Sequence, residues 1–152
     1  MKTCEISVTR RIVGRLDRGD ELPAALLAVC NAHNVRAGEI RAIGALEYAE
    51  VTEYDPEAQD YLPPLAHEGA CEILQLAGNV SERDGETFLH LHITGSHIDK
   101  NDPGHTKMIA GHLVSGKVFA CEFVIECWDD AELVRRQDKA TGLMLWDLPD
   151  KE

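Results

Sequence analysis

The sequence predicts an α+β domain built mainly from an antiparallel or mixed β-sheet, with a few helices. Several segments alternate apolar and polar residues with a two-residue period, one segment has clear helical spacing, and strands do not alternate regularly with helices. Aromatic residues make up only 5% of the chain, so we expect an aliphatic core. At 152 residues the chain is expected to form one compact domain, 1–152, with a tail from about residue 146.

The first half of the chain is predicted to hold one helix between strands. Apolar and polar residues alternate over 4–9, which indicates an opening strand that continues irregularly to Gly14. A helix is expected to begin after Asp20, as its N-cap, and to end near Asn34, because apolar residues recur there at helical spacing. We expect four elements to follow: a strand at 37–44, a bend at 44–47, a second strand at 48–54 and a proline-rich loop at 55–64.

The second half is predicted to be mostly strands. A hairpin is expected from 72–77 and 87–94, because the connection between them ends in the turn signal Asp84-Gly85. The remaining expected elements are a long strand at 117–127, a short charged helix at 131–139 and a final strand at 143–146.

Charge and cysteine content restrict the class of function. Acidic residues outnumber basic ones by 27 to 15, which gives a formal net charge of −12. Such a charge opposes unaided binding to nucleic-acid phosphates and adsorption to an anionic membrane. No signal peptide or membrane-spanning segment is recognisable. The five cysteines form no C-x-x-C pair, so we expect reduced core thiols in a cytoplasmic protein.

The segment 88–94 is the most informative for chemistry. His90 and His92 lie two residues apart on a predicted strand, so their side chains share one face. Their β-carbons, about 7 Å apart, allow both Nε2 atoms to reach one metal ion at ~2.0–2.1 Å. An exposed pair of strand histidines is the alternative. His112 follows Gly111, which lets the backbone approach closely, and is a candidate third ligand.

Two more histidines are additional candidates for the metal site. His97 and His105 lie in polar loop sequence, where exposure to solvent is the simpler expectation. Three neutral imidazoles suit a divalent transition metal, zinc first, and leave a fourth position for water or a ligand. That open position would distinguish a catalytic site from a structural one.

Other polar residues have less specific patterns. Glu122 and Glu126 lie four apart on a predicted strand and face the same way, so either can orient a ligand histidine or move a proton. Glu72 has the same potential, and a solvated sheet face is the alternative for all three. Arg41 lies in an apolar strand and is a candidate anion-binding residue, with an ion pair to a neighbouring glutamate as the alternative. No catalytic residue is assigned.

A series of short motifs runs in order along almost the whole chain. They are Arg15-Leu16-x-x-Gly19-x-x-Leu22, the predicted helix with Cys30 near its end, the segment 38–46, Tyr54-Asp55, the segments 72–81 and 88–92, Gly111-His112-Leu113 and Thr141-Gly142-Leu143. Each motif is weak alone, but the ordered series is specific. It resembles the plants and prokaryotes conserved domain, shortened to PPC, in its stand-alone prokaryotic form.

The resemblance implies a compact α+β domain, a homotrimer and, in some prokaryotic members, a histidine metal site. The family's His-Leu-His and Gly-His-Leu motifs fall on His90, His92 and His112. This chain departs from the family pattern between 93 and 110, where a longer connection adds two histidines. In land plants the domain is fused to AT-hooks that contact DNA, and this sequence contains no such hook.

Three functions therefore stand as alternatives. The first is a homotrimer whose histidine metal site binds or acts on a small polar ligand. The second is a DNA-binding or regulatory module that acts through the trimer or through partner proteins, which the acidic charge opposes. The third is a structural or assembly domain. The sequence names no reaction and no ligand.

Overall fold

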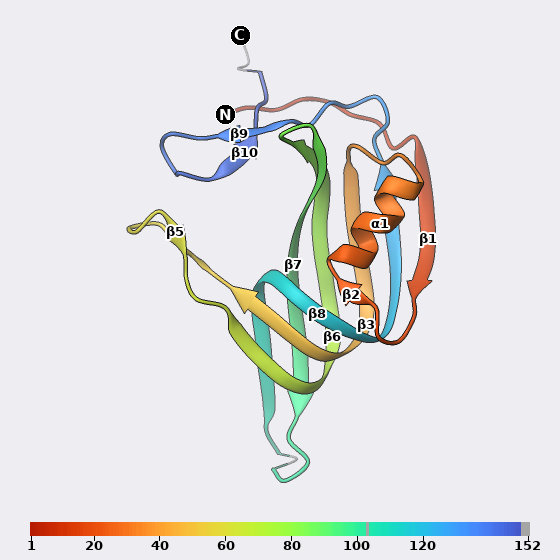
Figure 1. Ribbon diagram of the computed structural model, residues 1–152, viewed down its shortest axis with the longest axis vertical. Helices are drawn as coiled ribbons and strands as arrows, with labels where there is room; N and C mark the ends of the chain where they lie inside the picture. Colours follow the sequence, from red (N-terminus) through yellow and green to blue (C-terminus); the bar gives the residue numbers. More distant parts are fainter. Residues whose placement is uncertain (103, 150–152) are drawn as a thin grey trace.

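The computed structural model describes residues 1–102 and 104–149, and there it shows a strongly curved antiparallel sheet with a single helix (Figure 1). The predicted antiparallel sheet is confirmed, while the helix content is lower than expected. In chain order the elements are β1 (Arg10–Leu16), β2 (Glu21–Leu22), α1 (Ala24–Ala32), β3 (Gly38–Thr52), β4 (Tyr54–Asp55), β5 (Asp60–Tyr61), β6 (Leu65–Arg83), β7 (Glu86–Ile98), β8 (Thr106–Cys127), β9 (Arg135–Gln137) and β10 (Met144–Trp146).

The sheet closes on itself because its longest strand changes partners along its length. β8 pairs with β7 through residues 106–112, with β3 through 112–127 and with β1 through 121–127. β3 also pairs with β6, and β6 pairs with β7, so β8, β3, β6 and β7 form a closed ring. The core is aliphatic, as expected; its largest fully buried side chains include Ile40, Leu46, Leu76, Leu91 and Ile125.

The predicted hairpin and the predicted long strand are confirmed. β6 and β7 are joined at Asp84 and Gly85, whose φ angles of 54° and 84° are those that a tight hairpin turn requires. Both strands extend well beyond the predicted bounds. The segment 117–127 is the C-terminal half of β8.

The expected bend at 44–47 is an irregularity inside one continuous strand. β3 runs for 15 residues, and its pairing with β6 shifts register at two places. Gly44 has φ +147°, and a Cβ at this position would collide with the carbonyl oxygen of Ala120. The prediction of two separate strands was wrong because a β-bulge bends a strand without ending its pairing.

α1 is shorter than predicted and begins differently. Leu22 pairs with β8 as part of β2, and Pro23 occupies the N-cap position. The Asp20 carboxylate accepts a hydrogen bond from the backbone N–H of Asp17 (2.9 Å), so the prediction that Asp20 caps the helix was wrong. Buried side chains on the helix pack into the sheet core. The helix itself lies beside β1 and β2 in Figure 1.

The segment 131–139 contains no helix, so the prediction of a charged helix was wrong: β9 occupies Arg135–Gln137, and a turn begins at Lys139. Leu133 and Arg135 are buried with a half-buried residue between them, which is the alternation of a strand. The Leu133 carbonyl also accepts a hydrogen bond from the backbone N–H of Glu82 (2.8 Å). The final predicted strand is confirmed as β10, which includes Trp146 at the expected start of the tail. Residues 150–152 of that tail lie outside the described residues.

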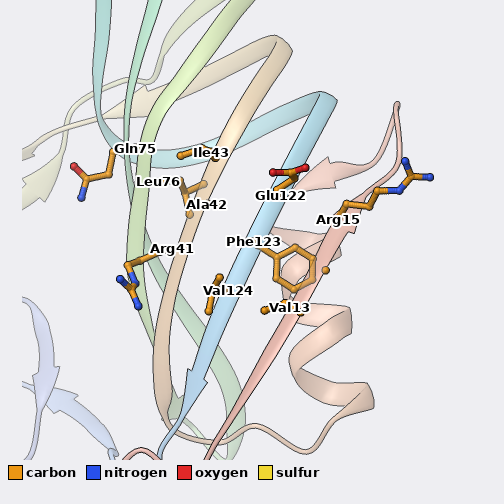
Figure 2. A pocket seen from close by; sticks show the side chains of 11 residues that line it. Val13, Arg15, Arg41, Ala42, Ile43, Gln75, Leu76, Glu122, Phe123 and Val124 are labelled. Carbon is orange, nitrogen blue, oxygen red and sulfur yellow. The ribbon is translucent and has the colours of Figure 1, made fainter.

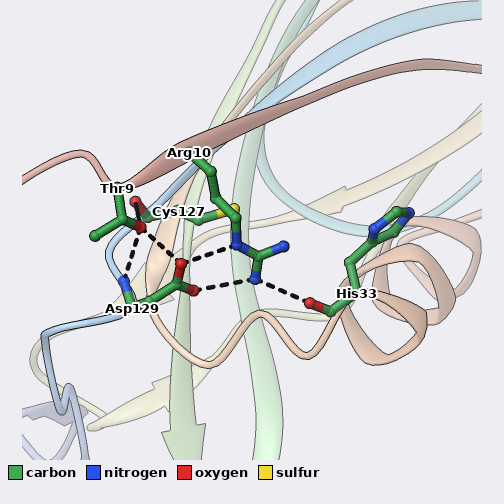
Figure 3. A network of polar contacts seen from close by, with 5 residues as sticks. All are labelled: Thr9, Arg10, His33, Cys127 and Asp129. Atoms are coloured by element: carbon green, nitrogen blue, oxygen red, sulfur yellow. Dashed lines mark hydrogen bonds and ion pairs between the residues drawn. The ribbon is translucent and has the colours of Figure 1, made fainter.

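The first strand, β1, begins at Arg10 and not at residue 4, while the predicted continuation to Gly14 is confirmed as part of it. A network of polar contacts surrounds the start of β1 (Figure 3). Arg10 donates through Nε and Nη2 to the two carboxylate oxygens of Asp129 (2.8 and 3.0 Å), and Nη2 also donates to the His33 carbonyl (2.9 Å). Thr9 Oγ1 donates to Asp129 (2.7 Å). Hydrogen bonds from Arg10 and Thr9 hold the pKa of Asp129 at about 2. The network ties the N-terminal segment to the ends of α1 and β8.

All five cysteines are unpaired, and four of them are buried. Cys4 is exposed, so the expectation of a core thiol was wrong for that residue. Within the ranges 1–102 and 104–149, no helix has both the length and the apolar character needed to cross a membrane.

Candidate metal centre

Three histidines meet where the ring closes between β7 and β8. His90 and His92 are two residues apart on β7, as the alternation predicts. His112 on β8 is the direct cross-strand partner of His92 in this antiparallel pairing. Pairing of the two strands thus brings a third imidazole to the pair that β7 already presents.

The geometry suits a single metal ion. His90 Nε2 and His92 Nε2 are 3.1 Å apart, and each histidine offers a ring nitrogen within 4.8 Å of the others. Ring centroids are separated by 5.0 to 5.5 Å. Tetrahedral ligands ~2.0–2.1 Å from zinc lie about 3.3 Å from one another, so small side-chain rotations bring the three nitrogens into range.

The protonation states favour cation binding. Burial, reinforced by the positive charge of Arg135, lowers the pKa of His90 to about 4. Burial also lowers the pKa of His112. Both imidazoles are therefore neutral near pH 7, which is the state that ligates metals. His112 Nδ1 is buried and has no hydrogen-bond partner among the described residues, so this ring nitrogen is free of protein partners there.

A glycine sets the approach of His112. Gly111 has φ +152°, a backbone conformation that side chains rarely adopt. A Cβ at Gly111 would lie 2.9 Å from the Thr52 carbonyl oxygen on β3. The residue before His112 therefore has to be small for β8 to pass between β3 and β7 at this point.

The three histidines border a pocket of about 930 Å³. Aromatic residues form part of its wall: Tyr61 packs on the His112 ring (centroids 5.3 Å apart), and Phe88 lies beneath Arg135, whose Cζ is 5.2 Å from the ring centroid. His92 is exposed, while His90 and His112 are half-buried. The arrangement leaves one side of the cluster open to a small molecule.

Arg135 was not predicted as a site residue. It is 6% exposed, and its Nη2 lies 3.5 Å from His90 Nδ1. The sequence places it in a charged segment 45 residues from His90, with no motif to connect the two. No sequence pattern marks Arg135, because only its burial distinguishes it from the other charged residues of this segment.

The structure places the additional candidate ligands elsewhere. His97 Nδ1 donates to the Ala70 carbonyl (2.7 Å), and its ring packs against His67. His105 Nδ1 contacts the Asp102 carboxylate three residues earlier (2.7 Å). Neither belongs to the three-histidine cluster.

The acid/base and anion-binding candidates lie on the outer face of the sheet. Arg41 donates to the Glu126 carboxylate (3.1 Å), so it forms the ion pair that was the alternative to anion binding. Glu122 lines a separate pocket of about 730 Å³ with Val13, Arg41 and others (Figure 2), and none of the histidines borders it. Glu72 is exposed on β6. The structure therefore does not bring Arg41, Glu122 or Glu72 to the histidine cluster.

A sequence profile of the Plants and Prokaryotes Conserved (PCC) domain matches residues 5–129. The chain belongs to this family. The PCC domain accounts for the whole ring of strands and for all three histidines. The resemblance drawn from the ordered motifs is thus confirmed, and no curated protein sequence matches the chain.

Solved structures share this PCC fold over nearly the full chain. A metal-containing protein from Archaeoglobus fulgidus is 34% identical, with a TM-score of 0.86 over 96% of this chain and 99% of that one. A plant- and prokaryote-conserved protein from Pyrococcus horikoshii is 28% identical, with a TM-score of 0.85 over 99% and 100%. A candidate DNA-binding protein from Bacteroides thetaiotaomicron is 26% identical, with a TM-score of 0.80 over 93% and 94%.

Proposed function

We propose that the protein binds one divalent metal ion, zinc first, through His90, His92 and His112, and that the adjoining pocket receives a small polar ligand. The observation that carries this proposal is the convergence of three ring nitrogens within 4.8 Å beside an open pocket. The name of the Archaeoglobus fulgidus protein, metal-containing, supports it.

The residues of the site have distinct roles in this function. Three neutral imidazoles hold the ion and leave a coordination position free, where zinc supplies Lewis acidity to a water or ligand oxygen. Tyr61 buttresses the His112 ring, and Phe88 covers part of the wall. These aromatic groups exclude water from one side of the ligand and restrict the orientation of the imidazoles.

The decisive experiment is metal analysis of tag-free protein by plasma mass spectrometry, with His92→Ala beside the wild type. We expect near one equivalent of zinc per wild-type chain and almost none in the variant. His105→Ala, outside the cluster, is the matched control and should keep its metal. Metal-free, correctly folded wild type after zinc loading and desalting would overturn the proposal.

Self-association is a second part of the proposal, with the homotrimer taken from the family resemblance. Apolar side chains on the outer face support an association between copies, because Val13 is 75% exposed and Ile43 is 58% exposed. Both line the outer-face pocket (Figure 2). Light scattering on a size-exclusion column tests the assembly; a trimer mass that falls on Val13→Asp supports it, and a monomer mass at micromolar concentration contradicts it.

Direct DNA binding is the weaker alternative. It is suggested by the name of the Bacteroides thetaiotaomicron protein, and a net charge of −12 opposes it. A gel shift at low salt that weakens steeply as salt rises would favour it. We expect no shift.

A further inference from the structure

Arg135 is a buried cation that forms no ion pair with the residues the structure describes. Its Nε donates to Ser81 Oγ (2.8 Å), Nη1 to the Met144 carbonyl (2.7 Å) and Nη2 to Asn79 Oδ1 (2.8 Å). All three acceptors are neutral, and within the described ranges no carboxylate forms an ion pair with this guanidinium. Burial of an unpaired charge is strongly unfavourable, so a protein that retains one has a reason to keep it.

The same guanidinium faces a ring nitrogen of the metal cluster. His90 directs Nε2 toward His92 (3.1 Å) and Nδ1 toward Arg135 Nη2 (3.5 Å). When Nε2 engages a cation, the neutral ring carries its proton on Nδ1, so Nδ1–H and the guanidinium are then two donors facing each other. A metal-binding histidine ordinarily donates this N–H to a carboxylate, a carbonyl or water. No residue in the described part of the chain supplies such an acceptor to His90.

The pocket gives an external acceptor access to both donors. Arg135 and His90 line the same cavity of about 930 Å³. Glu53 and Asp60 also line it, but neither forms a hydrogen bond with Arg135. The Phe88 ring beneath Arg135 supplies an apolar wall to this part of the pocket. A small molecule that carries a negative charge would supply the hydrogen-bond acceptor that these two donors lack.

We propose that this pocket binds a small organic carboxylate, whose carboxylate group accepts hydrogen bonds from the Arg135 guanidinium and from His90 Nδ1–H. The rest of the ligand then extends toward the three histidines. Arg83 also lines the pocket, but its guanidinium pairs with the Asp84 carboxylate (3.5 Å), so Arg135 supplies the cation that has no carboxylate partner in the described lining. One such guanidinium matches the single charge of a carboxylate, whereas a phosphate dianion calls for more donors. The inference rests on the proposed function, because His90 presents Nδ1–H when its Nε2 binds the metal.

Isothermal titration calorimetry on zinc-loaded, tag-free protein tests the proposal. The probes are lactate, its neutral analogue lactamide, and inorganic phosphate. We expect lactate to bind the wild type about 10-fold or more tightly than lactamide, because only the carboxylate accepts charge-assisted hydrogen bonds. Arg135→Gln should weaken lactate binding about 10- to 100-fold while zinc content stays near one equivalent.

Arg136→Gln is the matched control. Arg136 is the next residue on β9, its side chain is 71% exposed, and it pairs with Asp147 outside the pocket. The substitution makes the same change in charge and should alter lactate binding by about 2-fold or less.

The possible failures can be told apart. Equal affinity for lactate and lactamide, or tighter binding of phosphate than of lactate, overturns the carboxylate site while retained zinc leaves the proposed function standing. Protein that retains no zinc overturns the proposed function itself. If Arg135→Gln does not fold, as judged by circular dichroism, Arg135→Lys takes its place, because it keeps the charge but loses the planar fork that binds a carboxylate. Lactate affinity equal to that of the wild type in this variant would overturn the carboxylate site.

Discussion

The histidine pocket and the outer face of β1, β8 and β3 place their charges in opposite ways. On the outer face, the Glu126 carboxylate accepts from both Arg11 (2.9 Å) and Arg41 (3.1 Å). In the pocket, Arg135 is buried against neutral acceptors and has no carboxylate partner in the described chain. Exposed, paired charges lose little hydration free energy, and they contribute little to the stability of the fold. Burial of an unpaired charge is costly in free energy, and the position of Arg135 beside the three histidines is the observation behind the proposed carboxylate site.

The comparison shows how two arginines of this chain differ. An arginine in an apolar strand looks like a functional residue in sequence, but Arg41 projects from the outer face toward Glu126 and Glu39. Arg135 looks like one charge among many, and only its burial distinguishes it. The environment of a charge, and not its sequence neighbours, separates the two residues.

The largest expected effect is a loss of stability, and it differs between the two faces of β7. Leu91 is 1% exposed in the core, so Leu91→Ala should lower the free energy of unfolding by ~2–5 kcal/mol. His92→Ala, one residue away on the exposed face, should change it by about 0.5 kcal/mol or less in metal-free protein. Urea unfolding of both variants measures the difference. Similar losses for the two would mean that the histidine face is structural.

The next largest effect is expected at Gly111, where β8 passes close to β3 beside the three histidines. Gly111→Ala forces a Cβ against the Thr52 carbonyl in a strained conformation, so we expect a loss of about 1–3 kcal/mol and weaker zinc binding as His112 moves. Gly104→Ala, where a Cβ meets only Asp102 Oδ1 at 3.9 Å, should be near neutral. Thermal melting and zinc titration measure the two effects. Unchanged zinc affinity in Gly111→Ala would show that the cluster tolerates displacement of β8.

A pH titration distinguishes the pocket from the exposed network at Asp129. The pKa of His90 is lowered to about 4 in the folded protein, against about 6.5 when unfolded. Between these values the unfolded chain binds the extra proton, so metal-free protein should lose stability as the pH falls from about 6.5 to 4. Asp129, with a folded pKa of about 2, contributes stability that is lost only below about pH 4.

Melting temperatures of metal-free protein between pH 7 and 4.5 measure the first window, where we expect a fall of several degrees. His90→Gln should flatten the slope in that window, and Asp129→Asn should leave it unchanged. An identical slope in His90→Gln would contradict the assignment.

The smallest effect belongs to the outer face. Arg41 is 54% exposed, so Arg41→Gln should cost about 1 kcal/mol or less and leave the zinc content unchanged. Chemical unfolding and metal analysis on the same preparation give both values. A change in zinc content would show that the outer face communicates with the histidines.

Much of the fold could be predicted because it rests on local patterns. The hairpin of β6 and β7 follows from alternation and from one turn signal, and 143–146 follows from a short apolar run. The errors occur where tertiary contacts override a local preference. The pattern at Gly44 predicted the end of a strand, but β3 pairs with β6 on one side and with β8 on the other, and both pairings continue past Gly44. The charged segment 131–139 looked helical, but burial of Leu133 and Arg135 beside β6 keeps it extended.

The sequence by itself determined that His90 and His92 share a face, because successive side chains in a strand alternate regardless of what surrounds it. It also determined, through the ordered motifs, the family to which the chain belongs. Only the tertiary structure decided that His112 stands opposite His92, because that register depends on where the ring of strands closes. It likewise decided that Arg135 lies behind His90, since burial of a charge depends on long-range packing that no local pattern encodes.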